Sequence, residues 1–235
     1  MTAPSIRGYW TNDGFVGSWT TAPVAGDTIY VFTGPRDYQA GYSVPPNSTN
    51  FPVVRSNGNY SHLAKRTATG TSTDNPTSEN SIAIAVYGTD GERYAGNWQA
   101  TSINAVVGAV GSLNSGNPVG VDDLLVVVAT GALLTSYAYG YFGGTPINQT
   151  PSGMIQSAQC YLYDDYTGDG QFGNLTQATL LRKQLTSTTN PGSVSAAANV
   201  LTAAYNVYAE STMAILIKGS SAPSGPTAYG PSIRR

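Results

Sequence analysis

The stretch "ENSIAIAVYG", residues 79–88, returns in altered form as "ESTMAILIKG", residues 210–219. Glu, Ala, Ile and Gly occupy the same places in both stretches, and Ser81 stands where Thr212 stands. Apolar runs of this length, bounded by glycine and rich in β formers, predict strands rather than helices. The match indicates that one structural unit occurs twice in the chain.

A second pair of stretches supports the repeat. "PVAGDTIYVFTG" begins at Pro23 and "PVGVDDLLVVVATG" begins at Pro118, and in each a Pro-Val opening and an aspartate precede an apolar run. Between the two pairs, "YSHLAKR" (60–66) takes the place that "CYLYDDY" (160–166) takes in the second half. We therefore expect pseudo-repeats over about 20–90 and 115–219.

Composition favours an all-β chain. Only 10% of the 235 residues are charged, and Gly and Tyr are abundant, at 27 and 16 residues. Good helix formers are scarce, while uncharged polar and aromatic residues suit strands joined by many turns. We expect an antiparallel, jelly-roll-like β-sandwich over 20–219, between an N-terminal arm at 1–19 and an extended C-terminal tail at 220–235.

Two segments of the second half have apolar residues near helical spacing. They are "NLTQATLLRKQL" (174–185) and "SVSAAANVLTAAYNVYAES" (193–211), separated by Pro191-Gly192. This spacing predicts one or two short helices near 174–211. For 193–211 a pair of strands is the alternative, because Val and Tyr alternate near its end.

Charge and targeting signals limit the function. The net charge is −2, and Lys and Arg are thinly spread, so no basic face for nucleic acid is expected. The start "MTAPSIRGYW" lacks the basic and apolar runs of a signal peptide, and no stretch approaches a membrane-spanning length. We expect a protein made in a host cytoplasm, with no membrane partner. Its Thr/Gly/Tyr-rich composition is typical of extracellular β proteins, and a virion component combines both properties.

The strand and turn motifs resemble those of phage virion and bacterial surface β-sandwich modules. Those modules combine a strand of the Gly-Asp-Leu-Leu-Val type, a Pro-Ser-Gly-aromatic turn and a closing strand of the Ala-Val-x-Tyr-x-Gly type. The matching segments here are 26–31, 122–127, 151–154 and 83–90, within about residues 20–220. Met154 replaces the turn aromatic, and the first copy lacks the Ser-Gly pair. The resemblance implies an antiparallel sandwich with a structural or adhesive role, and it supplies no catalytic residues.

Few residues are candidates for chemistry. Asp165 and Asp169 in "DDYTGDGQF" match the first half of a calcium loop, but Thr176 stands where the closing acid belongs. A polar turn with aspartates bonded to their own backbone is the simpler interpretation. His62 and Cys160 are the only histidine and cysteine, and both fall in expected strands. We expect no enzyme activity, no metal and no cofactor.

The aromatic residues and the tail are candidates for contacts. Trp10 and Trp19 lie in a Gly-rich segment, where they are core residues, subunit-interface anchors or platforms for sugar rings. Tyr229 and Ile233 lie in the Pro/Gly/Ser-rich tail, which cannot bury itself and suits docking on a partner.

The sequence therefore predicts a non-enzymatic virion structural protein built on a β-sandwich. The expected role is a phage capsid decoration (cement) protein or a head- or tail-associated subunit. Its expected partners are the major capsid protein, other virion subunits and further copies of itself. The alternative is a carbohydrate-binding or adhesin module that recognises a surface glycan.

A chelator tests the aspartate loop. Because Thr176 leaves the loop one bidentate carboxylate short, we expect excess EDTA to leave the melting temperature unchanged. A drop of several degrees that disappears in Asp169→Ala would instead establish a calcium site.

Overall fold

The computed structural model describes most of the chain in separate ranges. They are residues 2–12, 17–36, 49–50, 54–56, 59–76, 81–99, 110–112, 119–134, 147–150, 152–164, 174–189, 193–197 and 207–220. The described residues are almost entirely β-strand, as expected, with one short 3₁₀ turn, η1 (Ser72–Asp74). No helix within these ranges is long and apolar enough to cross a membrane.

The first half of the chain forms one antiparallel sheet. Its strand order is β2-β1-β7-β3-β6-β4, with β5 also pairing with β6. The strands are β1 (Ser5–Asn12), β2 (Gly17–Trp19), β3 (Thr28–Arg36), β4 (Thr49–Asn50), β5 (Val54–Ser56), β6 (Asn59–Thr67) and β7 (Ser81–Tyr87).

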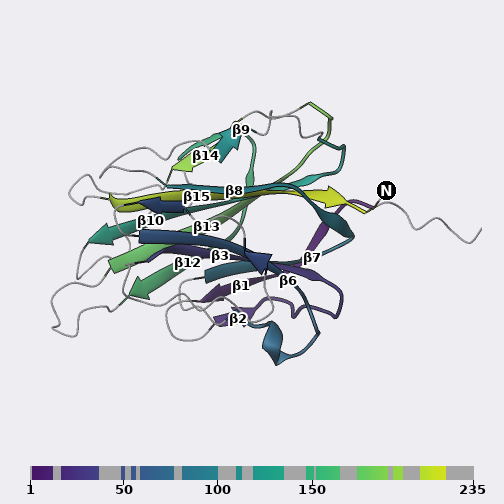
Figure 1. The fold of residues 1–235 in the computed structure, drawn as a ribbon, viewed down its shortest axis with the longest axis horizontal. Helices are drawn as coiled ribbons and strands as arrows, with labels where there is room; N and C mark the ends of the chain where they lie inside the picture. Colours follow the sequence, from purple (N-terminus) through teal and green to yellow (C-terminus); the bar gives the residue numbers. More distant parts are fainter. Residues whose placement is uncertain are drawn as a thin grey trace, which may run out of the picture.

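The second half forms a second antiparallel sheet and a small third one. The second sheet has the order β12-β13-β10-β15-β8, and the third has the order β11-β14-β9. Figure 1 shows β9 and β14 on the side of the second sheet that faces away from the first. The strands are β8 (Thr89–Gln99), β9 (Val110–Ser112), β10 (Leu124–Leu134), β11 (Ile147–Thr150), β12 (Ile155–Asp164), β13 (Asn174–Gln184), β14 (Ser193–Ala197) and β15 (Val207–Gly219).

The two large sheets have the same internal order. The neighbours β1-β7-β3-β6-β4 of the first correspond to β8-β15-β10-β13-β12 of the second. The quoted stretches fall in β7 and β15, which hold equivalent places beside the central strands β3 and β10. Register agrees as well: Val86 lies opposite Thr28 in the first sheet, and Ile217 lies opposite Leu124 in the second.

A matched carboxylate holds the start of each central strand. Asp27 accepts hydrogen bonds from the Val24 backbone N–H at 2.9 Å and from Arg7 Nε at 2.5 Å. Asp123 likewise accepts from the Gly120 N–H at 2.6 Å and from Arg93 Nε at 2.5 Å. We call each set an Asp–Arg clamp.

Each clamp arginine comes from a β-bulge. The register of β1 against β7 shifts between Ile6 and Gly8, at Arg7. The register of β8 against β15 shifts between Glu92 and Tyr94, at Arg93. A bulge leaves one residue outside the ladder and redirects its side chain, which here lets the arginine reach the aspartate. The same turn, bulge and ion pair thus occur in both halves.

The core lies between the two sheets. Buried side chains from β3, β6 and β7 pack with those from β10, β12, β13 and β15 in one apolar cluster that includes Phe32, Ile84, Val126, Leu180 and Ile215. The arrangement is therefore sandwich-like. A further apolar cluster covers the outer face of each sheet, one around Val31 and Trp10 and the other around Val127 and Leu181.

The helices expected near 174–211 are wrong for the described part of that segment. Residues 174–184, 193–197 and 207–211 lie in β13, β14 and β15, while 198–206 fall outside the described residues. Leu180 packs into the core between the sheets and Leu181 into the outer cluster. A strand buried on both faces carries apolar residues at consecutive positions, so its pattern imitates helical spacing.

Three other expectations differ from the structure. The expected arm at 1–19 contains β1 and β2, so the first unit begins at β1 rather than near residue 20. The "YSHLAKR" segment lies in β6, whose structural equivalent is β13, whereas residues 160–164 lie in β12. Each half also keeps to its own sheet, whereas a jelly roll winds successive strands across both sheets.

The clamps should contribute equally to stability. We expect Asp27→Ala and Asp123→Ala each to lower the free energy of unfolding by about 1.5–3 kcal/mol, the range for hydrogen bonds to charged groups. Urea unfolding measures both values. Asp122→Asn, at the exposed neighbouring aspartate with φ 69°, is the control and should have little effect. A large loss in only one of the two alanine variants would contradict the equivalence of the clamps.

Candidate functional site

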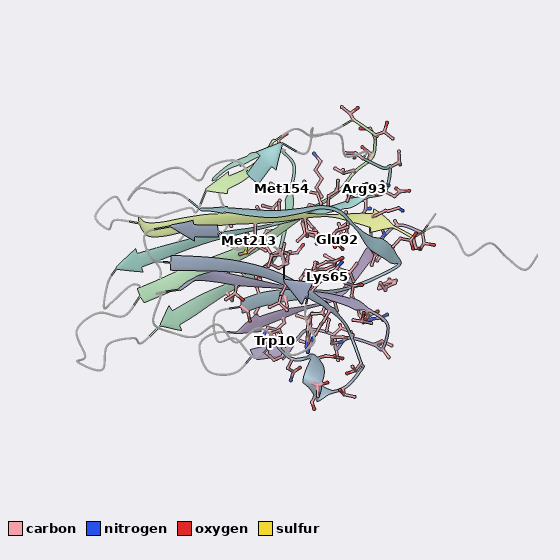
Figure 2. The ribbon with its side chains drawn as sticks, in the orientation of Figure 1. Trp10, Lys65, Glu92, Arg93, Met154 and Met213 are labelled. Atoms are coloured by element: carbon pink, nitrogen blue, oxygen red, sulfur yellow. The ribbon has the colours of Figure 1, made fainter. Side chains whose placement is uncertain are left out.

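A polar cleft opens between the two sheets at the end where β8 begins. Its volume is about 230 Å³, and the residues lining it are Thr28, Tyr30, Lys65, Arg66, Thr67, Gly91 and Glu92. Figure 2 shows Lys65 of β6 and Glu92 of β8 between the layers, on opposite sides of this opening. The cleft therefore combines side chains from both halves of the chain.

Strand alternation determines which side chains face the cleft. Thr28 and Tyr30 of β3 lie directly opposite Thr67 and Lys65 of β6. Side chains two residues apart share a face, and directly opposed residues share it as well. These four side chains consequently line one wall. Arg66, at the intervening position, belongs to the other face of the sheet, where its guanidinium lies 3.9 Å from Asp74.

An ion pair crosses the cleft. Lys65 Nζ donates to Glu92 Oε1, and the Tyr30 hydroxyl donates to Glu92 Oε2 at 3.4 Å. The Lys65 side chain is 30% exposed and that of Glu92 is 16% exposed. Burial raises the pKa of Tyr30 most, and the negative charge of Glu92 and its hydrogen bond raise this pKa further. The phenol therefore stays protonated at neutral pH and remains a hydrogen-bond donor.

A second polar cluster stabilises the turn beyond β6. The buried Asp74 carboxylate accepts hydrogen bonds from the backbone N–H groups of Thr69, Gly70 and Thr71 at 2.7–3.2 Å. Burial opposes ionisation of Asp74, but the hydrogen bonds from Thr69, Gly70 and Thr71 outweigh it and lower the pKa. Because these hydrogen bonds hold the loop that contains Asp74, we assign this cluster a structural role.

The tryptophan candidates belong to the outer cluster of the first sheet. Trp10 is 5% exposed and packs edge-to-face on Trp19, with ring centroids 5.7 Å apart. Gly17 fits against the Trp10 ring, because a Cβ at that position would stand 2.1 Å from the ring. Of the three interpretations open to these two residues, the structure favours the core.

Other candidates remain untested or have no catalytic setting. Asp165, Asp169, Tyr229 and Ile233 lie outside the described residues. Cys160 is buried in the core between the sheets. In the described ranges no three His, Cys, Asp or Glu side chains gather where they could hold a metal ion.

Sequence reasoning missed the cleft. Lys65 and Glu92 are distant along the chain and meet only when the two sheets pack. A usable signal was nevertheless present in the repeat. Extending it to β1 and β8 aligns Glu92 with Ile6, a charged residue against an apolar one, and marks this position as different in the two halves.

The chain was also compared with known proteins. No family model, curated protein or solved structure matches it. The functional argument therefore depends on the residues and geometry of this chain.

The Asp74 cluster predicts acid sensitivity. Because folding lowers this pKa, the carboxylate contributes stability above its ordinary pKa of about 3.9, and that contribution is lost as the pH falls through the folded-state value. Asp74→Asn should be less stable at pH 7, and its stability should fall less steeply than the wild type below about pH 4. Urea unfolding across this pH range measures both effects. A slope in Asp74→Asn equal to that of the wild type would contradict the assignment.

Proposed function

We propose that this protein is a non-enzymatic structural subunit of a virion, acting through protein–protein contacts. The proposed role is a phage capsid decoration (cement) protein or a head- or tail-associated subunit. Its partners would be the major capsid protein, other virion subunits or further copies of itself. The low charge, the strand and turn motifs and the way the last strand ends support this proposal.

The single observation that carries the proposal is the anchoring of the chain just before its tail. Ser220 N donates to Gly88 O at 2.9 Å, and Thr2 N donates to Ser220 O at 2.9 Å. Backbone bonds thus tie the end of β15 to the junction between the two halves and to the N-terminal segment. A tail that starts from a fixed point loses less entropy when it docks than one on a frayed strand.

The surface beside this anchor offers apolar contacts. The large hydrophobic residues exposed among the described ones are Val24, Tyr87, Val121 and Ile155. Each lies near a strand end on the side of the sheets where Gly88 and Gly219 meet. Arg7 lies over the Tyr87 ring at 4.8 Å, which orders one of these side chains in advance. Exposed apolar side chains of this kind are suited to contacts with another protein.

The buried Trp10 and the partly buried Trp19 bear on the alternative function. A carbohydrate-binding module that stacks sugars on aromatic rings needs an open ring face. The Trp10 ring is instead enclosed by Gly17 and Trp19. A sugar-binding role would have to use another part of the molecule.

Deletion of the tail tests the structural role. We expect removal of residues 221–235 to leave the melting temperature nearly unchanged, because the anchoring bonds end at Ser220. The same deletion should shift the full chain from oligomer towards monomer in sedimentation velocity. Burial of Tyr229 and Ile233 on a neighbour would supply about 1.5–3 kcal/mol per side chain before ordering costs.

A matched variant separates contact from tail length. Tyr229→Ala combined with Ile233→Ala keeps the whole tail and should weaken association as the deletion does. Pro223→Ala should have a smaller effect. Equal association by the truncated and full chains would reject the tail as the assembly element.

A further inference from the structure

The repeat provides an internal reference for the polar cleft, because each of its side chains has an equivalent in the other half. The strand registers align Thr28 with Leu124 and Tyr30 with Val126. They also align Lys65 with Arg182, because Lys65 lies opposite Tyr30 and Arg182 lies opposite Val126. Glu92 lies opposite Ile217, and Ile6 lies opposite Val86. Because Ile217 and Val86 hold equivalent positions, Glu92 aligns with Ile6.

The equivalent position in the other half is filled by apolar side chains. Leu124 and Val126 are fully buried in the core, and Ile6 packs against them as part of the same cluster. The fold can therefore close this position with hydrocarbon. At the cleft the three equivalent positions carry the hydroxyl of Thr28, the phenol of Tyr30 and the carboxylate of Glu92.

The polar set is costly for folding. Burying a charge or an unpaired polar group is unfavourable, and well-packed apolar residues often stabilise as much as a buried ion pair. Stability alone does not explain why Glu92, Tyr30 and Thr28 stand where apolar residues serve in the other half. A function in binding does.

We propose that the cleft binds a small uncharged polyhydroxy molecule, a single sugar residue, either free or at the end of a glycan. Its walls present the hydroxyls of Thr28, Thr67 and Tyr30 together with the Lys65–Glu92 pair. Hydroxyl groups both donate and accept, and the two protein bonds to Glu92 use two of the roughly four acceptor positions of a carboxylate. This mixture of donors and acceptors suits a ligand rich in hydroxyls.

Charge argues against ionic ligands. The facing Lys65 and Glu92 cancel each other, and the guanidinium of Arg66, which also lines the cleft, lies 3.9 Å from the Asp74 carboxylate. An anion would therefore meet the Glu92 carboxylate, and a cation would meet the Lys65 ammonium. A neutral ligand avoids both repulsions and leaves the ion pair intact. The volume of about 230 Å³ is below the usual range for drug-sized ligands, which limits the occupant to one small ring. The fully buried Tyr30 offers no stacking face, and its hydroxyl is bonded to Glu92.

This binding function is independent of the virion role. A structural subunit with or without the tail contacts would retain the cleft, because the residues lining it lie in β3, β6 and β8. Failure of the tail deletion to change association would therefore leave the cleft proposal standing. Failure of sugar binding would likewise leave the structural role standing.

Titration of the full-length, ¹⁵N-labelled protein tests the proposal. The probes are glucose, galactose, mannose and N-acetylglucosamine, each as the free sugar and as the methyl glycoside, at millimolar concentrations. We expect at least one to cause saturable shifts of the Thr28, Thr67, Gly91 and Glu92 amide signals. Binding of the glycosides indicates the end of a glycan, whereas binding of the free sugars alone indicates a free metabolite. Either supports the cleft.

Two variants locate the binding. Thr28→Leu introduces the residue found at the equivalent position, Leu124, and should weaken binding about tenfold or more by filling the cleft. Thr67→Val removes one hydroxyl without adding bulk and serves if the leucine variant does not fold. Thr188→Leu and Thr188→Val make the same changes at an exposed threonine outside the cleft and should bind as the wild type does.

Three outcomes would overturn the proposal. The first is the absence of a saturable shift with any of the sugars. The second is a shift confined to amides outside the cleft, or one that Thr28→Leu and Thr67→Val leave unchanged. The third is a response of the cleft amides to sodium phosphate but to none of the sugars, because that would mean the site selects an anion.

Discussion

The fold depends on the apolar layer that the two halves bury against each other. Each half supplies one large sheet, and in the described part of the chain the inner faces of these two sheets pack on each other. A single antiparallel sheet with an apolar face exposed to water is not stable alone, so the halves must pack together. The need for this packing explains why Tyr30, Ile84, Val126 and Ile215 are fully buried.

The Asp–Arg clamps make this packing specific. A slip of one residue would turn the inner side chains of a strand outward, so register must be fixed wherever a face is buried. In each half the aspartate joins three features, namely the turn before the central strand, the central strand itself and a bulge in the strand two places away. The bulged arginine reaches its aspartate in only one register. The clamp therefore fixes the register at that end of each sheet. The cleft and the backbone hydrogen bonds of Ser220 both lie at that end.

The sequence predicted the elements that repeat strongly and missed those that repeat weakly. The stretches 79–88 and 210–219 are short, apolar and bounded by glycine, so their strand character and equivalence were readable. β1 and β8 share little beyond the clamp arginines, because bulged strands beside partly polar faces tolerate many residues. β13 was mistaken for a helix because burial on both faces removes the alternation that identifies a strand. The Lys65–Glu92 pair joins two sheets, and no local pattern specifies a contact of that kind.

The halves differ in the residues around the shared clamps. The outer face of the first sheet is covered by Trp10, Trp19 and Ala68, whereas that of the second is covered by residues that include Met154 and Leu185. The end of the central layer is polar in one half and apolar in the other. Such changes are tolerated because each lies at the margin of the shared layer, where a polar group retains partial access to water. A repeated fold can thus keep a position apolar for stability in one half while the equivalent position in the other half becomes available for binding.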